Sequence, residues 1–331
     1  MVYILAMLSS PDPLLDALRA AGEPTRFRIL ALLRHGDLAV GELVQILEQS
    51  QPRLSHHLKA LTQAGLVDRL PEGSWVFYRA AETGWARRLM DQIFIELDPA
   101  APQLSGDRER LKQVRAQRAE AAETYFGNVA EEWDQLRSLH FPNQDIEVAL
   151  RRLAGTGPFD RVIDLGTGTG QILVVLADLA RQLEGLDLSH QMLTVARAKL
   201  DQAGITHARV RQGDAAQTPF DADSADLVVI HQVLHYLEAP DAVLMETARL
   251  LRPGGRALIV DFAPHMLDFL RTQHGHRRLG IRSEDMSAWA RSAGLSLSEP
   301  LRFAPPPELD QGLSVHIWQA TKPGHDKEMA E

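Results

Sequence analysis

The sequence predicts two domains, in which a small, mainly helical domain precedes a larger α/β domain with a mostly parallel sheet. The length of 331 residues exceeds one ordinary hydrophobic core. Residues 1 to about 100 show short helical periods and then one alternating stretch, whereas strand and helix patterns alternate from about Thr124 to Lys322. We therefore expect the domains at 1–100 and 124–322, a connecting helix at 101–123 and a polar tail at 323–331.

The composition excludes several classes of protein. A hydrophobic content of 45% and a charged content of 24% are typical of a folded globular chain. The absence of cysteine excludes disulfides, thiolate metal sites and a cysteine nucleophile. The net charge of −9 disfavours non-specific coating of nucleic acid but allows a local DNA-binding surface. No segment approaches the roughly 20 apolar residues of a membrane span, and the apolar start lacks signal-peptide features, so we expect a cytoplasmic protein without membrane contact.

Helical patterns fill the first part of the amino-terminal domain. We expect helices at 13–21, from 24 to Gly36 and around 40–47, followed by one at 50–61. In this last segment Ser50 is a suitable N-cap residue. Three leucines at positions 54, 58 and 61 form one apolar face, and the polar side chains lie opposite. The composition of that outer face is typical of a helix that meets base edges and phosphates.

A β-hairpin is expected directly after this helix, at 67–79 with its turn at 71–74. From 51 to 79 there are four basic residues against two acidic ones, a net charge of +2 within an acidic chain. That positive charge lies where a DNA backbone would need it. The candidate DNA-contacting residues are Gln51, Arg53, Ser55, His56, Lys59, Arg69 and Arg79.

The order of these elements and the string S-H-H-L-K-x-L-x-x-A-G-L-V from Ser55 resemble the ArsR/SmtB family of winged helix-turn-helix repressors. The resemblance covers about the first 95 residues. It implies a homodimer that binds palindromic operator DNA, responds to a ligand and dimerises through residues 84–97. Ala39 and Gly41 replace the cysteines of the family's metal-sensing segment, so we expect no metal. A winged helix used for protein contact is the alternative.

Glycine-rich and acidic motifs follow successive strands in the carboxy-terminal domain. A strand at 159–165 leads into Gly166-Thr167-Gly168-Thr169-Gly170, where glycines allow a tight turn and a close approach of ligand to backbone. The G-x-G-x-G spacing differs from the G-x-G-x-x-G of dinucleotide-binding proteins. The next strand ends at Asp187, whose carboxylate can accept hydrogen bonds from two ribose hydroxyls. A third strand ends at Asp214, which can accept from an adenine amino group.

The strings V-I-D-L-G-T-G-T-G, G-L-D-L-S, G-D-A and L-R-P-G-G-x-A-L-I-V resemble the ordered motifs of class I S-adenosylmethionine-dependent methyltransferases, in particular the branch with the quinone-biosynthesis enzymes. The resemblance covers roughly 200 residues. It implies a Rossmann-like domain with a seven-stranded sheet, and S-adenosylmethionine or S-adenosylhomocysteine as cofactor. The implied cofactor-binding residues are Asp164, Gly166, Thr167, Gly168, Gly170, Asp187, Leu188, Met192, Asp214, Ala215, His231, Tyr125 and Trp133. The last two lie in a segment that resembles a cap helix or, alternatively, forms an amphipathic packing helix.

Candidate bases follow the fourth and fifth strands, on the side of such a sheet where ligands bind. His231 and His235 are the candidate catalytic residues, with Asp261 nearby in the pattern, although either histidine can instead serve the fold by hydrogen bonding. His274 to Arg278 is a basic cluster that suits an acidic substrate or a solvated loop.

Three functions remain to be compared. One is an operator-binding regulator that senses S-adenosylmethionine or its demethylated product, and another is an active small-molecule methyltransferase with an autoregulatory DNA-binding domain. DNA-base methylation is disfavoured, because no N/D-P-P-Y/F string follows the fourth strand and cytosine enzymes need a cysteine. The missing cysteines also exclude arsenite methylation.

Overall fold

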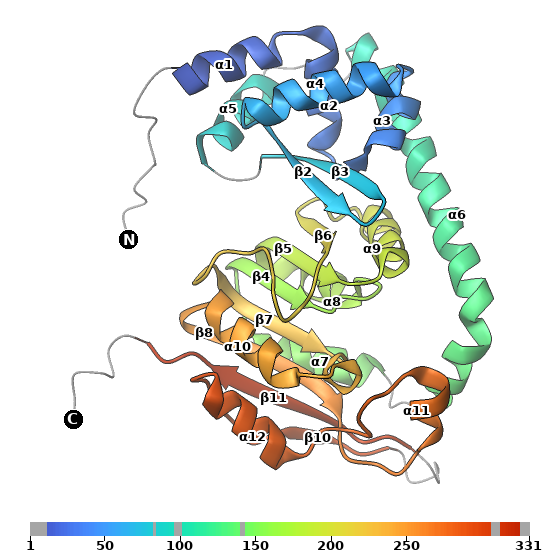
Figure 1. Ribbon diagram of the computed structural model, residues 1–331, viewed down its shortest axis with the longest axis vertical. Coiled ribbons are helices and arrows are strands. Elements are labelled where there is room, and N and C mark those ends of the chain that lie inside the picture. Colours follow the sequence, from blue (N-terminus) through green and yellow to red (C-terminus); the bar gives the residue numbers. More distant parts are fainter. Residues whose placement is uncertain (1–11, 82–83, 96–100, 140–142, 306–311, 325–331) are drawn as a thin grey trace. The chain divides into compact units, whose positions relative to one another are not determined.

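The computed structural model describes residues 12–81, 84–95, 101–139, 143–305 and 312–324, with side chains described except at 103 and 122–143. The chain divides into two compact units, 1–120 and 121–331 (Figure 1). Within the described ranges, no helix combines the length and apolar character that crossing a bilayer requires. Among the same residues, no group of three or more histidine or acidic side chains is arranged to hold a metal ion.

Unit 1 consists of helices around a three-stranded sheet of order β1-β3-β2. Its elements are α1 (Asp12–Ala21), α2 (Pro24–Leu33), β1 (Leu38–Ala39), α3 (Val40–Leu47), α4 (Gln51–Gln63), β2 (Val67–Glu72), β3 (Trp75–Ala80) and α5 (Gly84–Ile95). The three leucines of α4 are fully buried, which confirms the predicted apolar face. β2 lies at a sheet edge, where Pro71 is tolerated because a missing N–H costs no ladder bond.

The caps of α3 and α4 differ from each other. Ser50 precedes α4 in an extended conformation, but its side chain makes no capping hydrogen bond. At α3 the Glu42 carboxylate accepts the backbone N–H of Ala39 at 2.7 Å, so an acidic side chain in the first turn satisfies an otherwise unpaired donor.

The long helix α6 (Pro102–Leu139) begins in unit 1 and extends past the predicted end of the connecting helix at 123. Leu104, Leu111 and Val114 are buried, and the last two belong to the hydrophobic core of unit 1. Asp107 is buried on the same side and receives two hydrogen bonds from Arg28, at 2.6 and 2.7 Å. The first half of α6 is therefore part of the amino-terminal core and is more than a solvated connector.

Unit 2 is a mixed sheet of order β10-β11-β8-β7-β4-β5-β6, with β9 also paired to β11. Neighbouring strands from β6 to β8 run parallel, and β11 is antiparallel to β8. The strands are β4 (Phe159–Leu165), β5 (Ala180–Asp187), β6 (Ala208–Gln212), β7 (Ala225–His231), β8 (Leu251–Phe262), β9 (Ser296–Leu297), β10 (Leu301–Phe303) and β11 (Val315–Thr321). This order confirms the predicted Rossmann-like α/β domain.

The sheet has eight strands, so the predicted number of seven is one too low. The two short strands β9 and β10 both pair with β11, Leu297 opposite Ala320 and Leu301 opposite Ile317. Pro300 lies between them and has no N–H to donate to a ladder. One edge of the sheet is thereby divided into two strands.

Helices cover both faces of this sheet (Figure 1). Alternate residues of β7 enter two different cores, Leu227 and Val229 one, Val228 and Ile230 the other. The first core also contains residues of α7 (Asn143–Ala154), α8 (Gln171–Val175) and α9 (His190–Gln202), and the second contains residues of α10 (Pro240–Leu250) and α12 (Ser283–Ser292). A short helix, α11 (Phe269–His274), and two 3₁₀ turns, Ala177–Leu179 and Leu234–Tyr236, complete the unit.

Candidate functional site

The glycine-rich turn between β4 and α8 has the backbone conformation that its glycines allow. Gly166, Gly168 and Gly170 have φ of 75°, 51° and 74°. A Cβ on Gly166 would overlap the side chain of Val233, and one on Gly170 would lie 3.1 Å from Cβ of Ala196. A Cβ on Gly168 would meet no atom of the described residues within 4 Å. Packing therefore requires a glycine at 166 and leaves little room for a side chain at 170, whereas the middle glycine borders open space.

Asp187, at the end of β5, ties this turn to the neighbouring strand. Its Oδ2 accepts the backbone N–H of Gly168 at 2.8 Å, and its Oδ1 accepts that of Ser189 at 2.8 Å. The hydroxyl of Ser189 then accepts the N–H of Met192 and caps α9. Leu188, between them, leaves 63% of its surface exposed. The carboxylate and an exposed apolar side chain thus lie next to the open turn.

Asp164 lies beneath the turn and is 1% exposed. Its Oδ2 accepts the hydroxyl hydrogen of Thr167 at 2.6 Å, and its buried Oδ1 has no hydrogen-bond partner among the described residues. Burial, and less strongly the charge of Asp187, raises the pKa of Asp164 to about 7, although the Thr167 bond opposes the shift. An unpartnered buried oxygen beside a glycine turn is a position at which a ligand donor would be stabilised.

Two of the remaining predicted cofactor-binding residues, Asp214 and Ala215, make no hydrogen bond to the glycine-rich turn among the described residues. Asp214 follows β6 and accepts the N–H of Ala216 at 2.8 Å, while Ala215 is buried in the core. His231 is the last residue of β7. The next residue, Gln232, has a positive φ of 56°, and its backbone N–H donates to the carbonyl of Val260. Tyr125 and Trp133 fall in α6, where the side chains are outside the described residues.

A buried histidine–aspartate pair forms after β7 and β8. Nδ1 of His235 lies 2.8 Å from Oδ1 of Asp261, and the two side chains are 1% and 0% exposed. The carboxylate also accepts the backbone N–H of His235 at 3.3 Å and of Phe262 at 2.7 Å. Nε2 of His235 is buried and has no hydrogen-bond partner in the part of the chain that the structure describes.

Two further histidines gather around this pair. The ring of His276 lies 4.2 Å from that of His235, and His276 is 3% exposed. Burial, and then the neighbouring histidines, lowers the pKa of His276 to about 3, and burial also lowers the pKa of His265. The backbone N–H groups of Arg277 and Arg278 donate to the carbonyl of His235. The reading of this segment as a solvated loop is thus wrong for His276, because tertiary packing encloses its ring.

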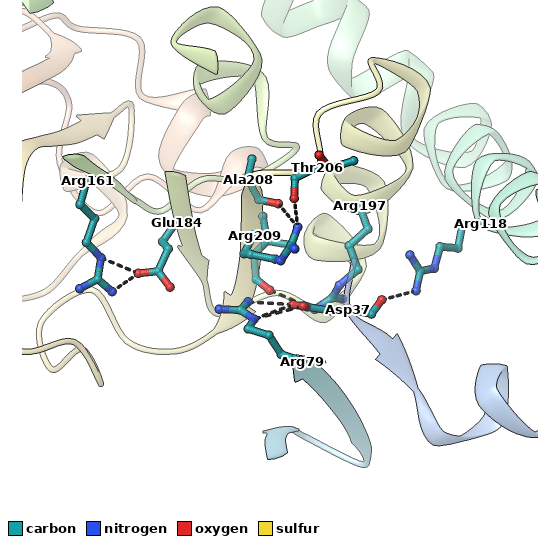
Figure 2. A network of polar contacts seen from close by, with 10 residues as sticks. Asp37, Arg79, Arg118, Arg161, Glu184, Arg197, Thr206, Ala208 and Arg209 are labelled. Atoms are coloured by element: carbon teal, nitrogen blue, oxygen red, sulfur yellow. Dashed lines mark hydrogen bonds and ion pairs between the residues drawn. The ribbon is translucent and has the colours of Figure 1, made fainter. Parts of the chain in front are cut away.

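The predicted DNA-contacting residues separate into two groups. Five of them, Gln51, Arg53, Ser55, His56 and Lys59, are exposed on α4, and Arg69 is exposed on β2. Arg79 is 5% exposed and forms an ion pair with Asp37, with Nη2 at 2.7 Å from Oδ2 (Figure 2). The expected contact of Arg79 with a DNA backbone does not fit this geometry, because a buried carboxylate already occupies its guanidinium.

Known proteins match both units. The family model "bacterial regulatory protein, arsR family" matches residues 23–69, and the family model "methyltransferase domain" matches residues 163–259. The ubiquinone/menaquinone biosynthesis C-methyltransferase UbiE of Xanthomonas campestris is 31% identical over 199 residues, which are 57% of this chain and 78% of that protein. This chain belongs to the class I methyltransferases and carries an arsR-family domain in front.

Other methyltransferases match shorter stretches. The uncharacterized methyltransferase YcgJ of Bacillus subtilis is 31% identical over 105 residues, and the demethylmenaquinone methyltransferase of Clavibacter sepedonicus is 32% identical over 148 residues. These stretches are 31% and 44% of this chain and 42% and 60% of the relatives, so the chain spans about half their length. A solved structure of a putative methyltransferase from Bacillus halodurans has a TM-score of 0.48 at 21% identity and covers 54% of this chain and 98% of its own.

Sequence reasoning missed several polar residues that link the arsR-family domain to α6. Asp37 receives Arg79, and Arg118 donates to the backbone carbonyl of Asp37 at 2.9 Å (Figure 2). A signal for α6 was present, because Leu104, Asp107, Leu111, Val114 and Arg118 recur at intervals of three and four residues, the spacing of one helix face. No comparable local pattern marks Asp37, which precedes a strand of two residues.

Proposed function

We propose that the chain is an arsR-type transcriptional regulator whose methyltransferase domain binds S-adenosylmethionine or S-adenosylhomocysteine, and that occupancy of this site changes its affinity for operator DNA. The observation that carries the proposal is α6, one helix whose residues belong to both units. A coupling of about 1–3 kcal/mol between the two sites is enough to switch operator occupancy.

The first half of α6 makes hydrogen bonds to the segment that precedes α4, the helix with the candidate DNA-contacting residues. Arg118 donates to both carboxylate oxygens of Glu42 in α3, at 2.6 and 2.7 Å, and Arg115 donates to the carbonyl of His35 at 2.7 Å. Arg110 donates to the carbonyl of Ile46, near the end of α3. A movement of α6 therefore acts on α3, which immediately precedes α4. The proposed signal enters through the continuation of α6, where Tyr125 and Trp133 are the candidate contacts with the cofactor.

The residues of unit 2 fit an adenosyl amino acid. Open space lies beside Gly168, Asp187 offers a carboxylate next to it, and Oδ1 of Asp164 receives no hydrogen bond from the described residues. In the proposed complex Asp187 holds the ribose hydroxyls and the turn faces the amino-acid part. Leu188 and Met192 pack against the adenine, and Asp214 with Ala215 marks its edge. When bound, the methylated cofactor supplies an electrophilic methyl group, and the protein aligns an acceptor and excludes water.

The regulator proposal is tested by operator binding. A DNA fragment that the purified protein selects from a random library is titrated at fixed salt by fluorescence anisotropy, with each cofactor form absent or saturating. We expect operator affinity to change by roughly 5- to 150-fold with one of the two forms. Sedimentation of the same complex should give two chains per palindromic site, as the arsR-type domain implies.

Two variants separate binding from coupling. Asp187→Asn should weaken cofactor binding by about ten- to a hundred-fold, because an amide accepts hydroxyl donors less strongly than a carboxylate. Arg118→Gln should keep cofactor binding and lose the response of operator affinity. Lys112→Gln, on the exposed face of the same helix, is the matched control and should change neither. If wild-type operator affinity is the same with and without both cofactor forms, the regulator proposal is wrong.

A second function is favoured by the pair His235–Asp261, which has the geometry of a base and its orienting carboxylate. In this alternative the chain is an active small-molecule methyltransferase that regulates its own expression through the arsR-type domain. Incubation with methyl-labelled cofactor and cell extract should then give a labelled product that requires the protein. The absence of such a product would count against turnover and leave the regulator proposal intact.

A further inference from the structure

Two carboxylates flank the glycine-rich turn, one beneath it and one beside it. Asp164 is 1% exposed and accepts the hydroxyl hydrogen of Thr167 at 2.6 Å. Asp187 accepts the backbone N–H groups of Gly168 and Ser189, each at 2.8 Å. All three donors are neutral, and within the described residues neither carboxylate is hydrogen-bonded to a basic side chain. The surroundings of the turn therefore carry negative charge that the chain leaves uncompensated.

The buried oxygen Oδ1 of Asp164 is unsatisfied in either protonation state. It makes no hydrogen bond with any described residue. A protonated Asp164 carries its hydrogen on Oδ1, because Oδ2 already accepts from Thr167, and that O–H has no acceptor. An ionised Asp164 leaves the same oxygen without a donor. A buried polar atom of this kind beside a candidate ligand site indicates a group whose state changes with what binds.

The ionisation of Asp164 is balanced near neutral pH. Burial raises the pKa of Asp164 to about 7, the charge of Asp187 acts in the same direction, and the Thr167 bond opposes both. Among the described side chains, neither His231 at the end of the neighbouring β7 nor a charged group of α7 or α9 contributes to this pKa. About half of the molecules therefore hold the proton at pH 7, where a change in local charge has its largest effect.

One cation does lie close to the turn. Nζ of Lys199 in α9 is 3.2 Å from Oγ1 of Thr169 and 3.0 Å from Oε1 of Gln171. Burial lowers the pKa of Lys199, and the charge of Glu147 in α7 opposes that shift. Within the described residues Lys199 makes no ion pair with either aspartate of the site. Its charge is directed to Glu147 and leaves the carboxylates at the turn unpaired.

We propose that Asp164 senses the charge of the bound ligand, and that it adds to the affinity for S-adenosylmethionine, a sulfonium, but not for S-adenosylhomocysteine, a neutral thioether. This inference rests on the cofactor site of the proposed function and names the form that the site favours at neutral pH. Sulfur joins the ribose to the amino-acid part, so a ligand with its ribose at Asp187 and its amino-acid part at the turn brings the sulfonium close to Asp164. The amino-acid part is common to both forms, so only the charge on sulfur distinguishes them.

The charge acts on Asp164 through space and requires no contact with the buried oxygen. At about 7 Å and an effective dielectric constant of about 20, a unit charge changes an ionisation equilibrium by roughly 50-fold. The open space beside Gly168 gives a ligand access to the turn. Binding of the sulfonium therefore releases the proton of Asp164 to solvent, whereas binding of the thioether leaves it in place.

Calorimetric titration of the full chain with each cofactor form at pH 5.5, 6.5 and 7.5 measures this coupling. At low pH the sulfonium must displace a proton, so its affinity relative to the thioether should rise with pH. For a ten-fold change in the ionisation equilibrium of Asp164, the ratio of the two affinities should rise about five-fold from pH 5.5 to 7.5. In buffers of different ionisation enthalpy at pH 6.5, S-adenosylmethionine should release about half a proton and S-adenosylhomocysteine close to none.

Three variants identify the group that titrates. Asp164→Asn cannot release a proton, so its affinity ratio should lack this rise. Any remaining change records the α-amino groups of the ligands, which begin to titrate at the top of this range. Thr167→Val removes the hydrogen bond that favours the ionised carboxylate, so the rise should begin at a higher pH. Asp241→Asn, exposed at the start of α10, is the matched control and should follow wild type.

Thermal melting of each variant checks folding, and Thr167→Val provides the test if Asp164→Asn does not fold. The inference is overturned if the affinity ratio of wild type is independent of pH, if it rises equally in folded Asp164→Asn, or if both ligands release the same number of protons. Binding of neither ligand would contradict the cofactor site and with it the proposed function. Binding of both without a difference in proton release would contradict only the role of Asp164.

Discussion

The glycine turn and the histidine cluster are two polar regions beyond carboxyl ends of strands in one sheet, but they are built in different ways. The turn is a contiguous segment, 166–170, whose backbone is tied to Asp187 on the next strand. The cluster brings together His235 after β7, Asp261 near the end of β8 and His276 beyond α11. One region depends on backbone conformation, and the other depends on burial of side chains from distant segments.

This difference explains why the two regions respond to different perturbations. Backbone geometry in the turn is set by φ angles and by the space that a side chain would need, so steric substitutions should disturb it. The cluster is set by desolvation and charge, so pH and neutral isosteres should disturb it. Asp164 is the exception, because it lies at the turn but its pKa is set mainly by burial.

Asp164 provides the largest expected effect. Its pKa is raised from 3.8 to about 7, chiefly by burial, so the folded state keeps a proton that the unfolded state loses. The contribution is fully present below about pH 4 and is lost as pH rises to about 7. From this shift we expect the free energy of unfolding of wild type to fall by about 4 kcal/mol relative to Asp164→Asn across that range.

Urea denaturation of both proteins at several pH values measures this difference. Asp241→Asn, an exposed aspartate at the start of α10, is the matched control and should follow wild type. Parallel curves for wild type and Asp164→Asn between pH 4 and 7 would contradict the raised pKa.

The sequence predicts the contiguous turn better than the cluster, which is assembled from distant segments. The order of strands, the turn and Asp187 were predictable, because each is a short contiguous pattern at the end of a strand. His235 was predicted only as one of two histidines, since its partner is 26 positions away and pairing depends on the sheet. The enclosure of His276, the pair Arg79–Asp37 and the break at Pro300 could not be predicted, because each depends on tertiary packing or strand pairing that no local pattern encodes.

Gly166→Ala should cost somewhat less than the ionisation of Asp164. The new Cβ would lie 2.9 Å from Cγ1 of Val233 and closer still to Cγ2, at a φ of 75°. Overpacking and a left-handed conformation together should lower the free energy of unfolding by about 3 kcal/mol. Gly168→Ala, beside open space, should lose only about 1 kcal/mol.

A double variant separates the two causes. Val233→Ala in the background of Gly166→Ala removes the two clashing methyl groups and should restore part of the loss, which a double-mutant cycle measures. Equal destabilisation by Gly166→Ala and Gly168→Ala would show that packing against Val233 contributes nothing.

For the histidine cluster, the pKa of His276 predicts a pH dependence of stability opposite to that of Asp164. This pKa is lowered from 6.5 to about 3, mainly by burial. Between these pH values the unfolded state binds a proton at the ring of His276 and the folded state does not. Its contribution is present above about pH 6.5 and is lost as pH falls toward 3. At pH 5 we expect the stability of wild type relative to His276→Asn to be about 2 kcal/mol lower than at pH 7. Chemical denaturation at the two pH values measures it, and an unchanged difference would contradict a neutral, enclosed ring.

The smallest effect is expected at the predicted DNA surface, where the same contrast separates two arginines of one hairpin. Arg69 is exposed on β2, so Arg69→Gln should weaken operator binding and reduce the slope of log affinity against log salt by about 0.9, the value of one phosphate contact. Arg79 is held by Asp37, so Arg79→Gln should leave that slope unchanged and instead lower the free energy of unfolding, because the variant removes a buried ion pair. Anisotropy titrations at several salt concentrations distinguish the two. A lower slope for Arg79→Gln would mean that its guanidinium leaves Asp37 to reach the DNA.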